Sequence, residues 1–349
     1  MGLQLGCRHC AGCCSAHCSR ERCTSVCLGH RFGVHSVPNI VAAYSDFAGG
    51  PAQPETYEAE VYGHAGDKAS GGPCDPAGFW EPHEEACPSG CPHSPDEVFP
   101  IPGDPGYTDV PNIGRLRIIK ALEEECAYNP GQLGKSRLLA EAYEFWRPVR
   151  GDGNCYYRTV AFGSLEALFA RGEHDRVRDI VDAFGQVSYE ASIENLHHAE
   201  LMRRLLSWRS SEQLEHWVAQ NNMMDQALVR ACRRLVRDFL IQHADEKSLN
   251  GLTYKDMVSA FVPAFDSIED FCADVVDPMG RDAETLTLSA LPMQLGVGVR
   301  IWILDRRDEV KLTRLDNLGP DGKIDVHALF KPGHYDLLYP RGVVVEGYH

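Results

Sequence analysis

The order in which helical and strand-like patterns follow one another most constrains the fold of this chain. Between residues 175 and 245 apolar residues recur at helical spacing, and one face carries Leu228, Cys232 and Val236. Strand-like runs come only afterwards, as "VGVRIWIL", "VHALF" and "HYDLLY". Helices followed by strands predict an α+β fold, in which a helical part packs on a small, mostly C-terminal β-sheet.

Four other segments also have helical patterns. Residues 113–127 carry apolar side chains at helical spacing, and residues 136–146 form a second predicted helix that ends at Pro148. A third is predicted from residue 155 to residue 170, and a fourth near residues 283–294. We therefore expect helices along most of the chain from residue 112 to the first strand.

The first 95 residues have the composition of a chain without a core. Leu, Ile, Val and Phe supply 12 of these residues, whereas Gly and Pro together supply 22. When these four residue types make up less than a fifth of a segment, it has too few apolar side chains to form a packed domain. We predict that residues 1–95 are mostly disordered and that a folded domain occupies residues 96–349, with its core between 112 and 340.

Cysteines are concentrated in this first region, where 10 of the 14 lie. Cys7, Cys10 and Cys13 form overlapping CxxC pairs, a spacing that lets two thiolates reach one zinc ion. Other candidate ligands are scattered irregularly, without a second pair at a fixed distance: His9, His17, His30, Cys87, Cys91 and His93. We favour an unstructured segment of biased composition, with zinc binding as the open alternative.

Charge and hydropathy exclude several classes of protein. The net charge of −16 on 349 residues argues against nucleic-acid binding, which normally needs a basic face. No apolar run approaches the roughly 18 residues of a membrane-spanning helix. The N-terminal residues lack a charged start followed by an apolar stretch, so we do not expect secretion. We expect a cytoplasmic protein, with the nucleus as a second compartment.

Cys155 stands out among the later cysteines because it ends the loop "GDGN" and begins a predicted helix. The N–H groups and the dipole at a helix start stabilise a thiolate. Glycines in the preceding loop allow a tight turn, so that successive N–H groups converge on an oxyanion. The pattern predicts a nucleophilic cysteine, although a packed cysteine in a tight turn would have the same sequence.

A thiolate nucleophile needs a histidine base, and the base needs an acceptor that orients it. His334 follows a Pro-Gly turn and begins a predicted strand, in which Asp336 comes two positions later. Side chains two apart lie on the same face of a strand. Asp336 is therefore placed to fix the tautomer of His334, as the third member of a catalytic triad does.

The remaining histidines and cysteines of this part fit structural roles better. Cys232 and Cys272 lie in apolar helical patterns and are expected in the core. Four histidines have polar helical neighbours and are expected at the surface or at helix ends: His197, His198, His216 and His243.

Together, "DGNCYYR" and the C-terminal "PGHYDLLY" resemble the ovarian-tumour (OTU) superfamily of cysteine deubiquitinases, in particular the otubains of peptidase family C65. The resemblance covers roughly residues 112–340, and it implies a papain-like OTU fold. By this resemblance Cys155 is the nucleophile, His334 the general base and Asp336 its orienting acid. Three residues then form the oxyanion loop, in which the aspartate is often counted as catalytic: Asp152, Gly153 and Asn154.

Two residues depart from the otubain pattern. Gly151 stands where otubains commonly have proline, and Tyr156 where they commonly have phenylalanine. Neither change removes a chemical group that the reaction needs.

The resemblance implies a thiol-dependent hydrolase that cleaves isopeptide bonds between the C-terminal glycine of ubiquitin and lysine, without a cofactor. Ubiquitin, polyubiquitin chains and a ubiquitin-conjugating enzyme are the expected partners. Two alternatives stay open at this point. One is a non-catalytic regulator that binds ubiquitin and a conjugating enzyme, and the other is a thiol protease of unrelated specificity, because only the resemblance points to ubiquitin.

Overall fold

The computed structural model describes residues 111–247, 251–262 and 265–343, and all of them belong to one compact unit. The expectations of disorder and of zinc binding in residues 1–95 lie outside these residues. Along the chain the elements are β1 (Arg117–Ile118), α3 (Ala121–Glu125), α4 (Pro130–Ala142), β2 (Tyr143–Arg147), α5 (Cys155–Ala170), α6 (His174–Phe184), α7 (Ser192–Ser207), α8 (Ser211–Gln220), α9 (Asn222–Gln242), α10 (Tyr254–Phe261), α11 (Ile268–Phe271), the π-helix η1 (Cys272–Val276), α12 (Thr285–Leu295), β3 (Val299–Ile303), β4 (Thr313–Asn317), β5 (Val326–Lys331) and β6 (His334–Pro340).

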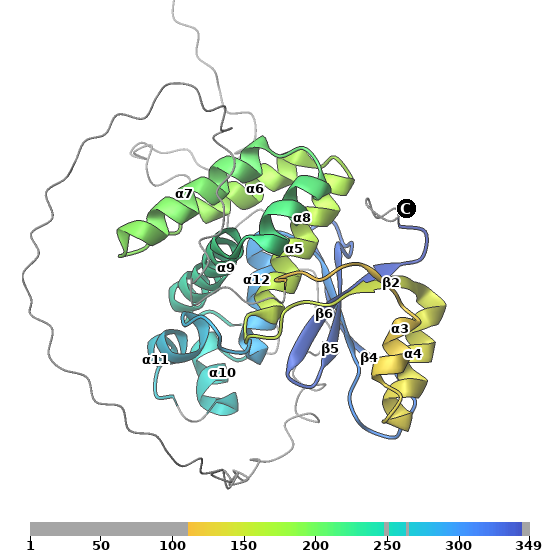
Figure 1. Ribbon diagram of the computed structural model, residues 1–349. Helices are drawn as coiled ribbons and strands as arrows, with labels where there is room; N and C mark the ends of the chain where they lie inside the picture. Colours follow the sequence, from red (N-terminus) through yellow and green to blue (C-terminus); the bar gives the residue numbers. More distant parts are fainter. Residues whose placement is uncertain (1–110, 248–250, 263–264, 344–349) are drawn as a thin grey trace, which may run out of the picture. The chain divides into compact units, whose positions relative to one another are not determined.

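The strands form one mixed sheet of six in the order β1-β2-β6-β5-β3-β4. Neighbours pair antiparallel except β3 and β5, which run parallel. Helices α3 and α4 cover one face of the sheet, and the larger helical layer around α5, α9 and α12 lies on the other (Figure 1). The predicted α+β architecture, with helices packed on a mostly C-terminal sheet, is confirmed.

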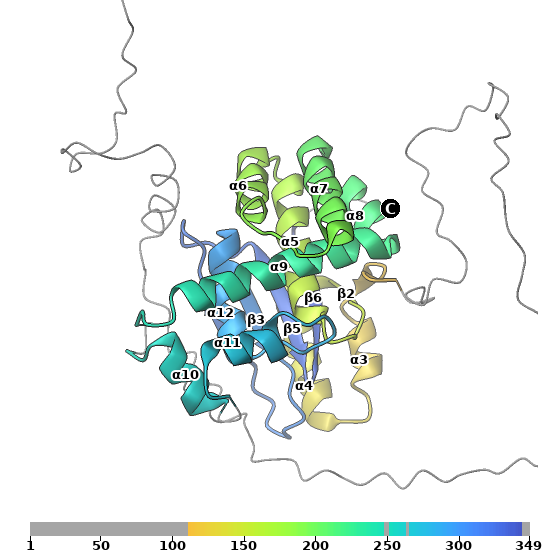
Figure 2. The ribbon, with the colours of Figure 1, turned by 90° about the vertical axis from the view of Figure 1, so that its left-hand side faces the viewer.

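Helix α5 is buried along nearly its whole length, between the sheet and helices α8 and α9 (Figure 2). A Cβ on Gly163 would lie 2.7 Å from the Leu337 side chain of β6, so a larger residue would push helix and sheet apart. The next residue of β6, Leu338, belongs instead to the apolar cluster that also contains Leu122 and Leu139 of α3 and α4. The period-2 alternation of β6 thus fills both interfaces of the sheet.

Two helix predictions near the start of the domain are wrong in part. Residues 113–127 hold only the short helix α3, because residues 117–118 pair with β2 instead. The helix predicted over residues 136–146 ends at Ala142, and Tyr143–Arg147 pairs antiparallel with β6. Leu139, Tyr143 and Trp146 have helical spacing, but aromatic residues also favour strands, and here the available sheet edge decided the outcome. Strand β4 was not predicted.

Most of the other expectations for single elements and residues are confirmed. Helix α5 has the predicted bounds, and α6 to α9 fill the helical stretch between residues 174 and 242. Cys232 and Cys272 are fully buried. His198 is a correction, because it is 6% exposed and its Nε2 lies 3.0 Å from the Phe184 carbonyl oxygen. Within the described residues, no helix is long and apolar enough to cross a bilayer.

Candidate active site

Cys155 is the first residue of α5 and is 3% exposed. The helix start places its side chain beside N–H groups that have no partner within the helix. The preceding Asn154 occupies the N-cap position, but its side chain makes no capping hydrogen bond to α5. Asparagine commonly caps a helix in this position, but the Asn154 side chain leaves the N–H groups in the first turn of α5 uncapped.

His334 and Asp336 lie on the same face of β6, as their spacing predicts. His334 Nε2 donates to Asp336 Oδ1 at 2.7 Å, since an ionised carboxylate can only accept. Because Nε2 is occupied in this way, Nδ1 is the nitrogen that remains for the Cys155 thiol, with which the His334 side chain also forms a hydrogen bond. The structure thus brings Cys155 and His334 together across 179 residues of sequence.

The protonation of His334 follows from these two contacts. Burial disfavours the charged imidazolium, but the hydrogen bonds to Asp336 and Cys155 outweigh burial and raise the pKa of His334 to about 9. At neutral pH the imidazole is therefore protonated opposite the sulfur. This is the arrangement that stabilises a thiolate and supplies a proton to a leaving group.

Asp336 is completely buried, and both of its carboxylate oxygens have partners. Oδ1 accepts from His334 and from the backbone N–H of Val149 at 2.9 Å, whereas Oδ2 forms an ion pair with Lys331 Nζ at 2.8 Å. Burial raises the pKa of Asp336, but the His334 hydrogen bond and the Lys331 charge outweigh it and lower the pKa overall. Asp336 is thus held as an anion.

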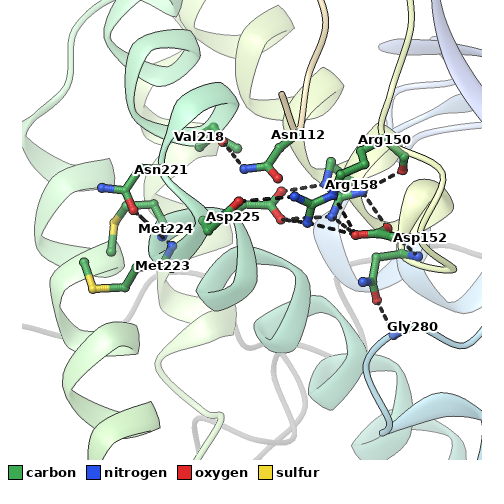
Figure 3. Close-up of polar contacts among 12 residues, drawn as sticks. Asn112, Arg150, Asp152, Arg158, Val218, Asn221, Met223, Met224, Asp225 and Gly280 are labelled. Carbon is green, nitrogen blue, oxygen red and sulfur yellow. Dashed lines mark hydrogen bonds and ion pairs between the residues drawn. The ribbon is translucent and has the colours of Figure 1, made fainter. Parts of the chain in front are cut away.

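The Asp152 side chain points toward the cluster of Arg150 and Arg158 (Figure 3). Its Oδ1 accepts from the Asn154 backbone N–H at 3.1 Å and from Arg158 at 2.9 Å, and its Oδ2 accepts from Arg150 and Arg158 at 2.9 Å each. Burial opposes ionisation, but the Arg158 contacts prevail and hold the pKa of Asp152 well below its usual range. Asp152 is thus placed to shape the loop and not to transfer protons.

Arg158 extends this cluster to α9, and sequence reasoning did not predict it. Its Nε and Nη2 donate to Asp225 at 2.6 and 2.9 Å, and both side chains are fully buried. A signal was present, because Arg158 is a lone cation in an otherwise apolar stretch of α5 and a buried charge needs a partner. The partner itself was not predictable from local spacing.

The remaining loop residues, Gly153 and Asn154, contact the segment after η1. Gly153 has a φ of +72°, and a Cβ there would lie 2.2 Å from the Gly280 carbonyl oxygen. Asn154 Oδ1 accepts from the Gly280 N–H at 2.9 Å and from the buried Arg233 of α9 at 2.9 Å. Arg233 and Lys331 are the other site residues that the sequence did not reveal.

Known proteins resemble this chain over the same region. A deubiquitinating enzyme of Arabidopsis thaliana, "OVARIAN TUMOR DOMAIN-containing deubiquitinating enzyme 1", is 26% identical over 66% of this chain and 82% of its own. The human ubiquitin thioesterase OTUB1 is 26% identical over 59% of this chain and 74% of its own. A solved complex of ceOTUB1 with ubiquitin aldehyde and UBC13~Ub has the same fold, with a TM-score of 0.54 at 23% identity, and it covers 66% of this chain and 94% of that one.

A match to a family model covers most of the residues that the structure describes. The family model of Peptidase C65 Otubain matches residues 107–340, a stretch that contains the whole Cys155, His334 and Asp336 site. With this match over more than half of its length, the chain belongs to the peptidase C65 otubain family.

Proposed function

We propose that this chain is a cysteine-type deubiquitinase that hydrolyses the isopeptide bond between the C-terminal glycine of ubiquitin and a lysine side chain, in conjugates or in polyubiquitin chains. The observation that carries the proposal is the contact of the His334 ring with both Asp336 and the Cys155 thiol. Family membership and the naming of relatives as ubiquitin thioesterases support ubiquitin as the acyl group.

In the first half of the reaction, the Cys155 thiolate attacks the carbonyl carbon of the C-terminal glycine. A bond forms between Sγ and this carbon, and the carbonyl oxygen becomes an oxyanion that the N–H groups at the start of α5 stabilise. When the oxyanion collapses, the C–N bond breaks and the lysine amine takes the proton of His334 Nδ1. The products of this half are a free lysine and a thioester between ubiquitin and Cys155.

In the second half, His334 takes a proton from a water molecule as the water oxygen attacks the thioester carbon. The C–S bond breaks, ubiquitin leaves with a carboxylic acid that loses its proton to solvent, and Cys155 returns to the thiolate beside a protonated His334. Asp336 keeps Nε2 protonated and stabilises the imidazolium throughout. No step requires a metal ion or an organic cofactor.

A ubiquitin derivative with a thiol-reactive group in place of its C-terminal carboxylate tests this proposal directly. The wild-type chain should form a covalent adduct of one ubiquitin per chain, and peptide mapping should place it on Cys155. The Cys155→Ala variant should form none, while a diubiquitin substrate should be cleaved by wild type alone. Reaction with a peptide ester that is as reactive toward thiols as the ubiquitin derivative, but not with the derivative itself, would indicate a thiol protease of other specificity.

A second role, binding of a ubiquitin-conjugating enzyme, is supported by structures of similar fold. OTUB1 chains occur in solved complexes with UBC13~Ub and UBCH5B~Ub, which makes such enzymes candidate partners here. Titration calorimetry of the Cys155→Ala variant with a stable UBC13–ubiquitin conjugate tests this role separately. Heat of binding that depends on the conjugating enzyme would support it, and binding equal to that of ubiquitin alone would oppose it.

A further inference from the structure

We propose that Arg233 is a positioning residue that keeps the oxyanion-binding N–H groups at the start of α5 open, because it holds the Gly153 carbonyl group and the Asn154 side chain away from them. This role rests on the proposed hydrolase function and adds a residue from a different helix, α9, to its machinery.

The first support is the peptide group between Gly153 and Asn154, which is held at both ends. Arg233 Nη2 donates to the Gly153 carbonyl oxygen at 3.0 Å, and the Asn154 N–H donates to Asp152 Oδ1 at 3.1 Å. A peptide group is planar, so fixing its oxygen and its N–H fixes the whole plane. The peptide therefore cannot turn its carbonyl oxygen toward the site where the oxyanion forms.

The second support is the direction of the Asn154 side chain. Asparagine at an N-cap position normally accepts a hydrogen bond from the first turn of its helix. Here the N-cap Asn154 makes no such bond, because its Oδ1 accepts from Arg233 Nη2 and from the Gly280 N–H, each at 2.9 Å. Gly280 approaches the loop that carries Asp152 from below (Figure 3). The donors at the start of α5 thus remain for a substrate oxygen.

The third support is that the contacts of Arg233 suit positioning and not an ion pair. Its guanidinium is fully buried, lies 4.1 Å from the centre of the Tyr157 ring, and donates to backbone oxygens of Val276, at 2.9 Å, and Arg281, at 2.5 Å. In the described part of the chain it forms no salt bridge with a carboxylate. One rigid fork thus joins the Cys155 loop to the segment that follows η1, which a flexible ammonium group would not do.

The Arg233→Lys variant tests the proposal, because it keeps the charge and loses the fork. We expect kcat for a ubiquitin amide substrate to fall roughly 10- to 100-fold, somewhat less than the loss of a direct oxyanion donor, with KM changed less than about threefold. Affinity for ubiquitin aldehyde, which places an oxyanion in the site, should fall by a similar factor, while affinity for ubiquitin itself is retained. Alkylation of Cys155 by iodoacetamide needs no oxyanion site and should proceed at the wild-type rate.

Arg234→Lys is the matched control. Arg234 is the next residue of α9 and contacts the same segment through Asp277 at 3.3 Å, but it contacts neither Gly153 nor Asn154 in the structure. It should keep the wild-type kcat and aldehyde affinity. If Arg233→Lys lowers affinity for ubiquitin and for its aldehyde equally, or leaves kcat unchanged, the positioning role is wrong.

Two further measurements separate this inference from the proposed function and from simple unfolding. Hydrogen exchange at the Asn154 amide should be faster in Arg233→Lys than in wild type, whether or not the chain cleaves ubiquitin. If wild type itself ignores ubiquitin, the proposed function fails, and this exchange rate still decides the role of Arg233. If Arg233→Lys does not fold, Arg233→Gln, which also loses the guanidinium fork, should show the same selective loss of aldehyde affinity, and its absence would overturn the inference.

Discussion

Lys331 Nζ lies 2.8 Å from Asp336 Oδ2, the carboxylate oxygen that His334 does not contact. The acid of the triad therefore shares its charge between an imidazolium and an ammonium group. Lys331 also contacts Glu125 of α3 at 3.3 Å and lies over the ring of Trp146. Lys331, three positions before His334, thus moderates the effect of the Asp336 charge on His334.

Replacing Lys331 should accordingly raise the pKa of His334. In Lys331→Met the Asp336 carboxylate loses its competing cation, so the imidazolium form becomes more stable than in wild type. The alkaline limb of kcat/KM should move to a pH above the wild-type pKa of about 9. Arg117→Met is the control, since Arg117 contacts Glu125 and Trp146 but has no contact with Asp336 in the structure. An alkaline limb that stays in place or moves down in Lys331→Met would contradict this reading.

The wild-type pH profile itself is a prediction. Because hydrogen bonds to Asp336 and Cys155 raise the pKa of His334 to about 9, the protonated imidazole that donates to the leaving amine is lost only as pH rises through that value. Activity should therefore decline around pH 9, and Asp336→Asn should shift the decline to lower pH.

The raised pKa of His334 also makes the stability of the fold depend on pH. It stabilises the folded state below the unfolded pKa of 6.5, and this contribution disappears as pH approaches 9. Thermal unfolding of wild type and His334→Ala should converge over that interval.

Single substitutions in the triad should differ in severity. Cys155→Ala should abolish cleavage and adduct formation, and His334→Ala should be nearly as damaging, because the leaving amine then lacks its acid. Asp336→Ala loses orientation and charge stabilisation, a loss that can reach about 10⁴ in turnover. Affinity for ubiquitin should remain in all three. Labelling of Cys126 or Cys272 would contradict the assignment, since both are buried and burial raises the pKa of each thiol.

The arginine cluster predicts a separation of stability from activity. Asp225→Asn leaves the fully buried Arg158 without half of its ion pairs, which should lower the free energy of unfolding by about 3–5 kcal/mol. Asp152→Ala should have a large effect on kcat and a smaller effect on the free energy of unfolding, because Asp152 is partly exposed and acts on the loop backbone. Urea unfolding and kcat measured on both variants test this. Asp175→Asn, which breaks the exposed ion pair with Arg178, is the control and should change the free energy of unfolding by about zero. Equal effects of Asp152→Ala and Asp225→Asn on kcat would show that the cluster acts as one structural unit.

Gly151 is expected to matter because its backbone lies against the His334 ring. A Cβ at this position would be 3.2 Å from His334 Nδ1, and the ring cannot retreat without lengthening its bond to Asp336. Gly151→Ala should lower kcat roughly tenfold, less than the about 10² that a displacement of 1 Å can cost. The unfolding temperature should remain that of wild type. Unchanged kcat in Gly151→Ala would mean that the ring adapts.

The sequence predicted those parts of the site that depend on local periodicity. Helix α5 begins at Cys155 and ends at Ala170 as expected, because apolar residues recur along it at helical spacing and its start is marked by a Gly-rich loop. His334 and Asp336 meet because alternation along a strand fixes their common face. The strand Tyr143–Arg147 was missed because its spacing fits a helix equally well, and only pairing with β6 distinguishes the two.

By itself, then, the sequence determined the helix that carries the nucleophile, the strand that carries its base and acid, and the family to which both motifs point. Only the tertiary structure decided that Arg158 meets Asp225, that Arg233 holds the Gly153 carbonyl, and that Lys331 shares Asp336 with His334. The physical reason is the range of the interactions. Helix starts and strand faces follow from neighbouring residues, whereas a buried arginine finds its partner only when the packing of α5, α9 and the sheet brings distant parts of the chain together.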